Sequence, residues 1–177
     1  MRLLDRRTVL LAVPAATLAP VSGVLVSTAL AVDALPDARF VGFCQAVNDF
    51  DIASGQLALA RSANESVRGY ATRSIAEATD AAQRLSKSRQ EAGVSYAPDG
   101  AMGPKTANLL QQLNALQGPA FDTAYANAQL SVQIDSEAQV GAYSQNGKSG
   151  PLRRYAQDTF PKSQRQLENA RRLAGGR

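Results

Sequence analysis

Residues 37–63 read DARFVGFCQAVNDFDIASGQLALARSA and decide the fold class. Their apolar side chains recur at spacings of three and four residues, which places them on one stripe of a helix. At 1.5 Å per residue, such a helix is roughly 40 Å long. Runs of β-branched residues of strand length do not follow it. The stretch therefore predicts a long amphipathic helix in an all-α protein, with a buried stripe at Phe40, Phe43, Cys44, Val47, Phe50, Leu57 and Ala58.

A second helix is expected from Glu65 to Ala92. Residues 62–65 fit a capping box, in which Ser62 or Asn64 serves as the cap, and Gly93 suits a helix end. The glycine- and proline-rich residues that follow, up to Gly103, predict a loop.

The second half of the chain predicts three further helical segments. Pro104 is expected to open a short helix, and Gly118-Pro119 to separate it from a long one that ends near Gln145. A last helical region over 152–173 is expected to be interrupted at Pro161. Four long amphipathic segments with short connections predict an antiparallel four-helix bundle, with the short extra helix in the central connection.

Residues 1–31 are expected to be an export signal, which leaves one helical domain over 32–177. The start is basic, residues 8–31 carry no charge, and Ala29-Leu30-Ala31 suits a signal peptidase. Residues 5–11 (DRRTVLL) resemble a twin-arginine signal, and a general secretory signal is the alternative. A retained membrane anchor is less favoured because prolines interrupt the apolar stretch. The expected location is the periplasm.

The composition excludes several kinds of chemistry within this chain. Its 177 residues include no His, no Trp and one Cys. Zinc sites of Cys and His, His-dependent triads, haem held by an axial His and an internal disulfide are therefore excluded. Residues 1–31 hold three of the 19 Lys and Arg and one of the 15 Asp and Glu, so the remainder carries 16 basic and 14 acidic side chains. That small excess does not predict a nucleic-acid-binding face.

Several short stretches together resemble a known family. They are residues 48–58 (NDFDIASGQLA), 67–71 (VRGYA), 121–125 (FDTAY) and 159–161 (TFP). Their order and spacing are similar to those of a bacterial family known only as a domain of unknown function, from about Phe40 to Leu173. The resemblance implies an exported protein with a ferritin-like four-helix bundle.

The departures from this family concern its metal-ligating residue types. Where relatives usually carry an Asp-His pair in the second helix, and one His each in the fourth and fifth, this chain has Glu77-Ala78, Gln133 and Gln166. Asp51 stands where a Glu is common. If relatives hold a metal there, as di-iron bundle proteins suggest by analogy, this chain lacks the imidazoles. The resemblance thus implies that a family metal site is lost.

Carboxylates alone could still hold a hard cation, and the candidates are Asp51, Glu77 and Asp135. The alternative is that these side chains bond to neighbours or face solvent. No catalytic constellation is present, and no cofactor is implied. We therefore expect a non-catalytic exported accessory or binding protein. The alternatives are a small subunit of a larger periplasmic oxidoreductase complex, suggested by the twin-arginine resemblance, and a carboxylate-based metal-binding protein.

The expected partner is another periplasmic or membrane-associated protein, not nucleic acid. Residues 99–106 (DGAMGPKT) are similar to a motif of small peptidoglycan-binding modules, although Asp-Gly and Gly-Pro are also ordinary turn residues. Peptidoglycan is therefore a less favoured partner. The basic end at Lys162, Arg165, Arg171, Arg172 and Arg177 suits a helix C-terminus, and an acidic partner surface is the alternative.

Two further residue types allow alternative interpretations. Cys44 is expected to pack as a small hydrophobic side chain, and an intermolecular disulfide is the alternative. The tyrosines Tyr70, Tyr125 and Tyr155 lie at helical positions beside apolar residues and are expected in the core or at its rim, not as redox residues.

Overall fold

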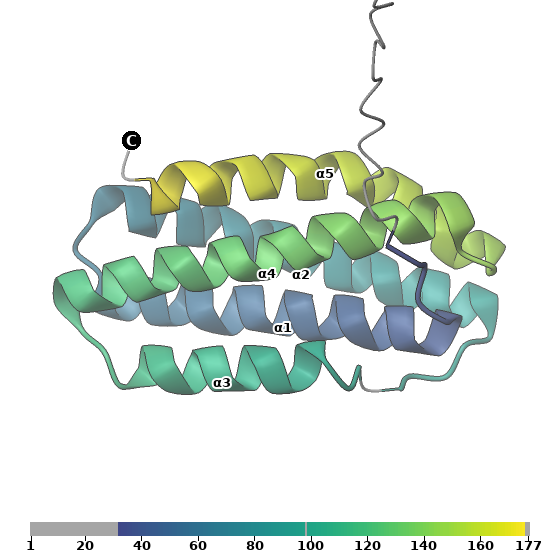
Figure 1. Ribbon diagram of the computed structural model, residues 1–177, viewed down its shortest axis with the longest axis horizontal. Helices are drawn as coiled ribbons and strands as arrows, with labels where there is room; N and C mark the ends of the chain where they lie inside the picture. Colours follow the sequence, from purple (N-terminus) through teal and green to yellow (C-terminus); the bar gives the residue numbers. More distant parts are fainter. Residues whose placement is uncertain (1–31, 98, 176–177) are drawn as a thin grey trace, which may run out of the picture.

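The computed structural model describes residues 32–97 and 99–175, and the export signal predicted over 1–31 lies outside this range. The described residues form five α-helices and no strand, which confirms the all-α class. The long helices lie side by side along the long axis of the molecule (Figure 1). The helices are α1 (Asp37–Arg61), α2 (Glu65–Ala92), α3 (Met102–Asn114), α4 (Gly118–Asn146) and α5 (Gly150–Ala174).

Each of the four long helices packs against two of the others. α1 packs on α2, α2 on α5, α5 on α4, and α4 on α1. The short helix α3 lies outside this group, against α1 and more weakly against α4 (Figure 1). Of the helices in the described part of the chain, none is long and apolar enough to cross a bilayer.

The caps of α2 follow the sequence closely. α1 ends at Arg61, two residues before the predicted end, and Asn64 supplies the cap. The Asn64 side-chain oxygen accepts hydrogen bonds from the backbone N–H groups of Ser66 (2.9 Å) and Val67 (3.3 Å). At the other end Gly93 has a φ of 63°, a left-handed conformation that favours glycine.

The start of α3 differs from the prediction. The helix begins at Met102 rather than at Pro104, and the side chain of Asp99 bonds to the backbone just before and at this start. Oδ1 of Asp99 accepts from the backbone N–H groups of Ala101 (3.0 Å) and Met102 (2.6 Å). A side chain that satisfies these donors stabilises a helix start earlier than proline alone suggests.

The interruption predicted at Pro161 is wrong, because α5 continues through this residue. Proline removes one backbone N–H, so the carbonyl of Gln157 loses its helical partner. Gln157 and Pro161 are both exposed, and that carbonyl can bond to solvent instead. Buried residues on both sides, Ala156 and Ser163, keep the helix packed against its neighbours.

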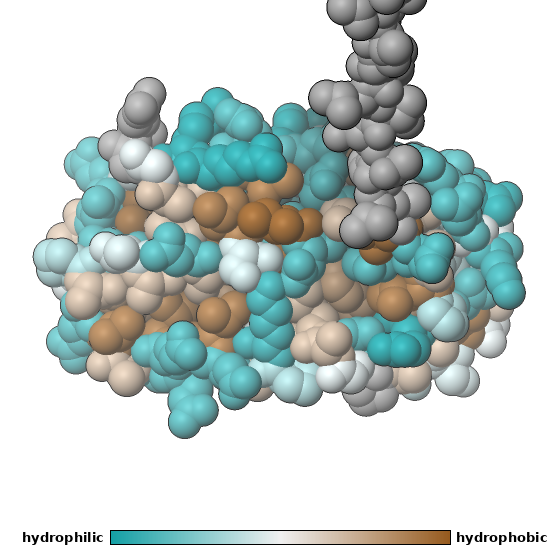
Figure 2. Space-filling model, in the orientation of Figure 1, coloured by the Kyte–Doolittle hydropathy of each residue, from teal (hydrophilic) through white to brown (hydrophobic). Residues whose placement is uncertain are grey.

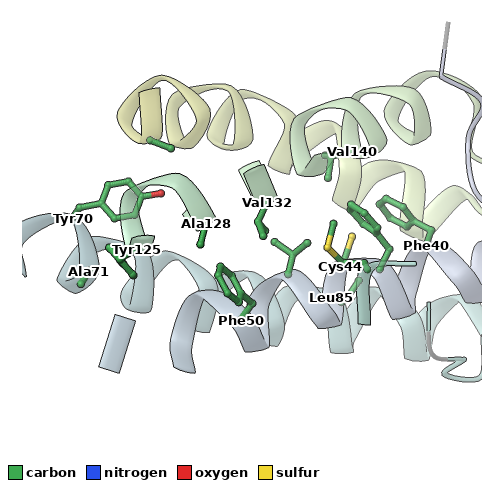
Figure 3. Packing of buried hydrophobic residues seen from close by; sticks show 14 of the residues in the cluster. Phe40, Cys44, Phe50, Tyr70, Ala71, Leu85, Tyr125, Ala128, Val132 and Val140 are labelled. Atoms are coloured by element: carbon green, nitrogen blue, oxygen red, sulfur yellow. The ribbon is translucent and has the colours of Figure 1, made fainter. Parts of the chain in front are cut away.

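The core follows the predicted stripe of α1 with small differences. Every predicted position of the stripe is buried except Leu57, which is half-buried. On α4, Tyr143 is buried, and its ring stacks on Phe40 with centroids 3.7 Å apart. Figure 3 shows Phe40 and Cys44 at one end of this core and the predicted tyrosines Tyr70 and Tyr125 at the other.

Gly42 allows the connection between α2 and α3 to pass closely over α1. A Cβ at Gly42 would lie 1.8 Å from the carbonyl oxygen of Ala97 and 2.8 Å from the backbone nitrogen of Asp99. Both neighbours are backbone atoms, so a side chain here displaces the loop that leads into α3.

We predict that Gly42→Ala lowers the free energy of unfolding by about 1–3 kcal/mol or more, because the backbone must shift. The matched control is Gly103→Ala, where a Cβ meets no atom within 4 Å and replacement of a helical glycine is neutral or stabilising by up to about 1 kcal/mol. Urea denaturation followed by circular dichroism compares the two variants. Equal stability of both would contradict the close packing at Gly42.

Cys44 is buried, as predicted, and it has no disulfide partner among the described residues. Burial raises the pKa of this thiol far above its usual value, so little reactive thiolate forms. We predict that a disulfide-exchange reagent labels the native protein at least a hundredfold more slowly than the urea-unfolded protein. Rapid labelling of the folded protein would show that Cys44 is accessible.

Candidate functional site

The three candidate carboxylates lie in different surroundings. Asp51 on α1 is only 2% exposed, whereas Glu77 on α2 is exposed. Asp135 on α4 is partly exposed and forms an ion pair with Lys105 of α3, with Oδ2 2.6 Å from Nζ. Among residues 32–97 and 99–175, no group of three or more His, Cys, Asp or Glu side chains is arranged to hold a metal ion. The structure therefore does not bring the predicted carboxylate set together.

Asp51 bonds instead to a glutamine of a neighbouring helix. The amide Nε2 of Gln133, on α4, donates to both carboxylate oxygens, at 3.2 Å and 3.0 Å. Gln133 is fully buried. This contact joins α1 to α4 inside the protein, at one of the positions where the family resemblance implied a histidine.

A second hydrogen-bonded chain lies one helical turn away. The hydroxyl of Tyr70 donates to Oε1 of Gln129 (3.2 Å), and Nε2 of Gln129 donates to Oγ of Ser54 (3.0 Å). The Ser54 hydroxyl donates in turn to the carbonyl of Phe50 (2.6 Å). This chain links α2, α4 and α1 through buried groups. We call the whole set the polar core; it comprises Asp51, Ser54, Tyr70, Tyr125, Gln129 and Gln133.

Helix geometry explains how these residues meet. Tyr125, Gln129 and Gln133 are spaced by four residues, so they lie on one face of α4. Asp51 and Ser54 are three residues apart and share a face of α1 in the same way. Polar residues within an apolar stripe resemble solvent-facing positions in the sequence, which is why Gln129 and Ser54 were missed. Phe121, Tyr125 and Gln129 are four residues apart, and this spacing is the signal that could have identified Gln129 as buried.

Several buried polar atoms in and around the polar core have no hydrogen-bond partner among the described residues. They are Nδ2 of Asn48, Oγ of Ser74, the hydroxyl of Tyr125 and Oε1 of Gln133. Each of these residues is more than nine-tenths buried. Groups of this kind usually bond to an ordered water or a bound ion. The oxygen atoms among them, together with the single carboxylate of Asp51, are of the type that coordinates hard cations.

The polar core also holds a proton near neutral pH. Burial raises the pKa of Asp51 to about 7, although the hydrogen bonds from the Gln133 amide oppose this change. Burial raises the pKa of Tyr70 and Tyr125 as well, and the charge of Asp51 adds to the effect. The phenols therefore stay protonated, and Asp51 is the group that titrates at neutral pH.

The other positions implied by the resemblance supply few donors. Ala78 is buried and offers no ligand atom, and Gln166 on α5 is half-buried. The stretch 99–106 leads into α3, with Asp99 bonded to the backbone N–H groups of Ala101 and Met102 and with Thr106 buried in the first turns of the helix.

These features define an all-helical protein with a buried polar core that contains one carboxylate. A family model described as "Domain of unknown function (DUF4142)" matches residues 25–173. Because the match covers most of the chain, the protein belongs to this family. Neither the curated proteins nor the solved structures include a match to the chain.

The raised pKa of Asp51 predicts an unusual pH dependence of stability. The folded protein keeps this proton up to about pH 7, whereas the unfolded chain releases it near pH 3.8. Between these values the native state binds more protons, so stability falls as the pH rises, by about 1.4 kcal/mol per unit and by about 4 kcal/mol in total. The loss is complete above pH 7.

Asp51→Asn removes this titration and is expected to flatten the profile of unfolding free energy between pH 4 and pH 8. The control is Asp49→Asn, which changes an exposed carboxylate of the same helix and leaves the slope unchanged. Chemical denaturation at a series of pH values measures both. Parallel profiles for wild type and Asp51→Asn would show that Asp51 does not titrate between its folded and unfolded states as described.

Proposed function

We propose that this protein is an exported accessory or binding protein that acts through its packing and surface, without catalysis of its own. The observation that carries this proposal is the bonding of Asp51. Its two oxygens accept from the Gln133 amide, while Glu77 and Asp135 lie at the surface. A lone carboxylate among amides and phenols supplies neither a nucleophile with its base nor a pair of acid and base groups.

The architecture that we infer is an antiparallel four-helix bundle of the ferritin-like type, built from α1, α2, α4 and α5. The closed packing order of these helices and the short connections after α1 and α4 support it. The short helix α3 then occupies the central connection. In such a bundle the polar core lies where related architectures place metal ligands. We infer that the imidazoles of a family metal site are replaced here by Ala78, Gln133 and Gln166.

A hard cation in the polar core is the second candidate function, and the unpartnered oxygens favour it. Oε1 of Gln133 and the hydroxyl of Tyr125 are buried without a described partner. The charge of Asp51 acts on Tyr125, so the carboxylate is part of the same surroundings. One carboxylate with neutral oxygens suits a hard cation of low charge, whereas metals such as copper, zinc and nickel prefer nitrogen or sulfur ligands.

Affinity purification from the periplasm of the native host tests the first proposal, with the tag at the C-terminus. We expect the protein to be recovered from the periplasmic fraction together with a stoichiometric partner protein, and without a bound transition metal by elemental analysis. A partner that carries a redox cofactor would support the oxidoreductase-subunit alternative. Recovery of the protein alone, or in the cytoplasm, would contradict the proposal.

Elemental analysis of the same preparation separates the two candidate functions. Stoichiometric calcium, magnesium or an alkali ion that is lost in Asp51→Asn and kept in Asp49→Asn would favour the cation site. Stoichiometric iron or copper would contradict both candidates, since the interior of the described part offers no nitrogen ligand of the imidazole type.

A further inference from the structure

Positive charge is concentrated on two neighbouring helices. Among the described residues, α2 carries five and α5 six Lys and Arg side chains, against four and two Asp and Glu side chains. α4, in contrast, carries three acidic side chains and no basic one. Figure 2 shows hydrophilic residues along α5, at the top of the view. The faces of α2 and α5 are therefore the basic side of the molecule.

A hollow of about 340 Å³ lies on this side, between the start of α2 and the end of α5. We call it the arginine hollow. Glu65 and Leu173 also line it. Its defining residues are Ser66, Gly69, Tyr70 and Arg73 from α2, and Asn169 and Arg172 from α5.

The two arginines have hydrogen-bond donors to spare. Nη2 of Arg172 donates to Oδ1 of Asn169 at 2.5 Å, which holds the guanidinium in place. Its ion pair with Glu168 is long, at 3.8 Å, and both side chains are more than half exposed, so the pair is weak. Arg73 makes no ion pair with another described residue. Two guanidinium groups from two helices thus line one hollow with a single carboxylate, that of Glu65.

The wall of the hollow includes the surface of α2 against which the Arg73 side chain lies. A Cβ at Gly69 would lie 3.6 Å from Nη1 of Arg73, so the Arg73 side chain folds back over the glycine. Tyr70 forms part of the same wall, and its hydroxyl is bonded to Gln129 in the polar core. The wall is therefore fixed to the interior and does not depend on exposed side chains alone.

We propose that the arginine hollow binds a phosphate group of a ligand or of a membrane lipid. A carboxylate is satisfied by one guanidinium fork, whereas a phosphate group has enough oxygens to engage two forks from different directions. Because the pair between Arg172 and Glu168 is long and exposed, a bound phosphate group can replace Glu168 as the partner of Arg172. This inference rests on the binding function proposed above and gives that function its chemical target.

Titration of the purified protein with inorganic phosphate, at constant ionic strength, tests the proposal by calorimetry. We expect saturable binding by the wild type, and at least tenfold weaker binding by Arg73→Gln and by Arg172→Gln. The matched control is Arg171→Gln, which removes an exposed arginine of the same turn that does not line the hollow. This control is expected to change the affinity less than twofold. Circular dichroism confirms that each variant folds, and Arg172→Lys, which keeps the charge without the fork, is expected to bind with intermediate affinity.

No saturable phosphate binding by the wild type, in solution or on vesicles, would overturn the proposal. A loss in Arg171→Gln equal to that in Arg172→Gln would overturn it too, because binding would then follow net charge alone. Sedimentation with phosphatidic acid vesicles, against phosphatidylcholine vesicles, distinguishes the source of the group. Recruitment that depends on Arg73 assigns a lipid headgroup, and binding of free phosphate without recruitment assigns a soluble phosphate ester. The recovery of a protein partner is measured separately, so either proposal can fail alone.

Discussion

The hydrogen bonds between the Asp51 carboxylate and the Gln133 amide are the interaction on which the rest of this account depends. A buried carboxylate without a partner would strongly destabilise the fold. The amide of Gln133 on α4 provides two charge-assisted hydrogen bonds. These hydrogen bonds therefore stabilise the buried charge of Asp51 and join α1 to α4. They also occupy both carboxylate oxygens, which are the atoms that would bind a metal ion.

The remaining polar groups of the interior are arranged around that contact. The chain from Tyr70 through Gln129 to Ser54 crosses three helices and continues the polar face of α4 by one turn. A hydrogen-bonded network of this kind specifies how the helices align, because each partner must be met in the low-dielectric interior. On the outside, Tyr70 forms part of the wall of the arginine hollow. The interior and the proposed binding surface thus share one side chain.

Local patterns predicted the helices well, because caps and periodicity act within one element. Asn64, Gly93 and the stripe from Phe40 to Ala58 all behave as their spacing indicates. Contacts between distant residues could not be predicted in this way: Asp51 and Gln133 are 82 positions apart. The burial of Asp51, the exposure of Glu77 and the pairing of Asp135 with Lys105 depend on how the helices pack, not on residue type. Pro161 shows the same limit, since packing keeps α5 intact.

The most direct measurement of the central interaction is a double-mutant cycle of Asp51→Ala and Gln133→Ala, at a pH where Asp51 is ionised. The cycle compares the stability loss of the double variant with the sum of the losses of the two single variants. The difference is the coupling energy of the two side chains. The account predicts a favourable coupling of about 1.5–3 kcal/mol, the range for a hydrogen bond to a charged group. Additive effects, with a coupling near zero, would contradict it and would leave the Asp51 carboxylate free for another partner.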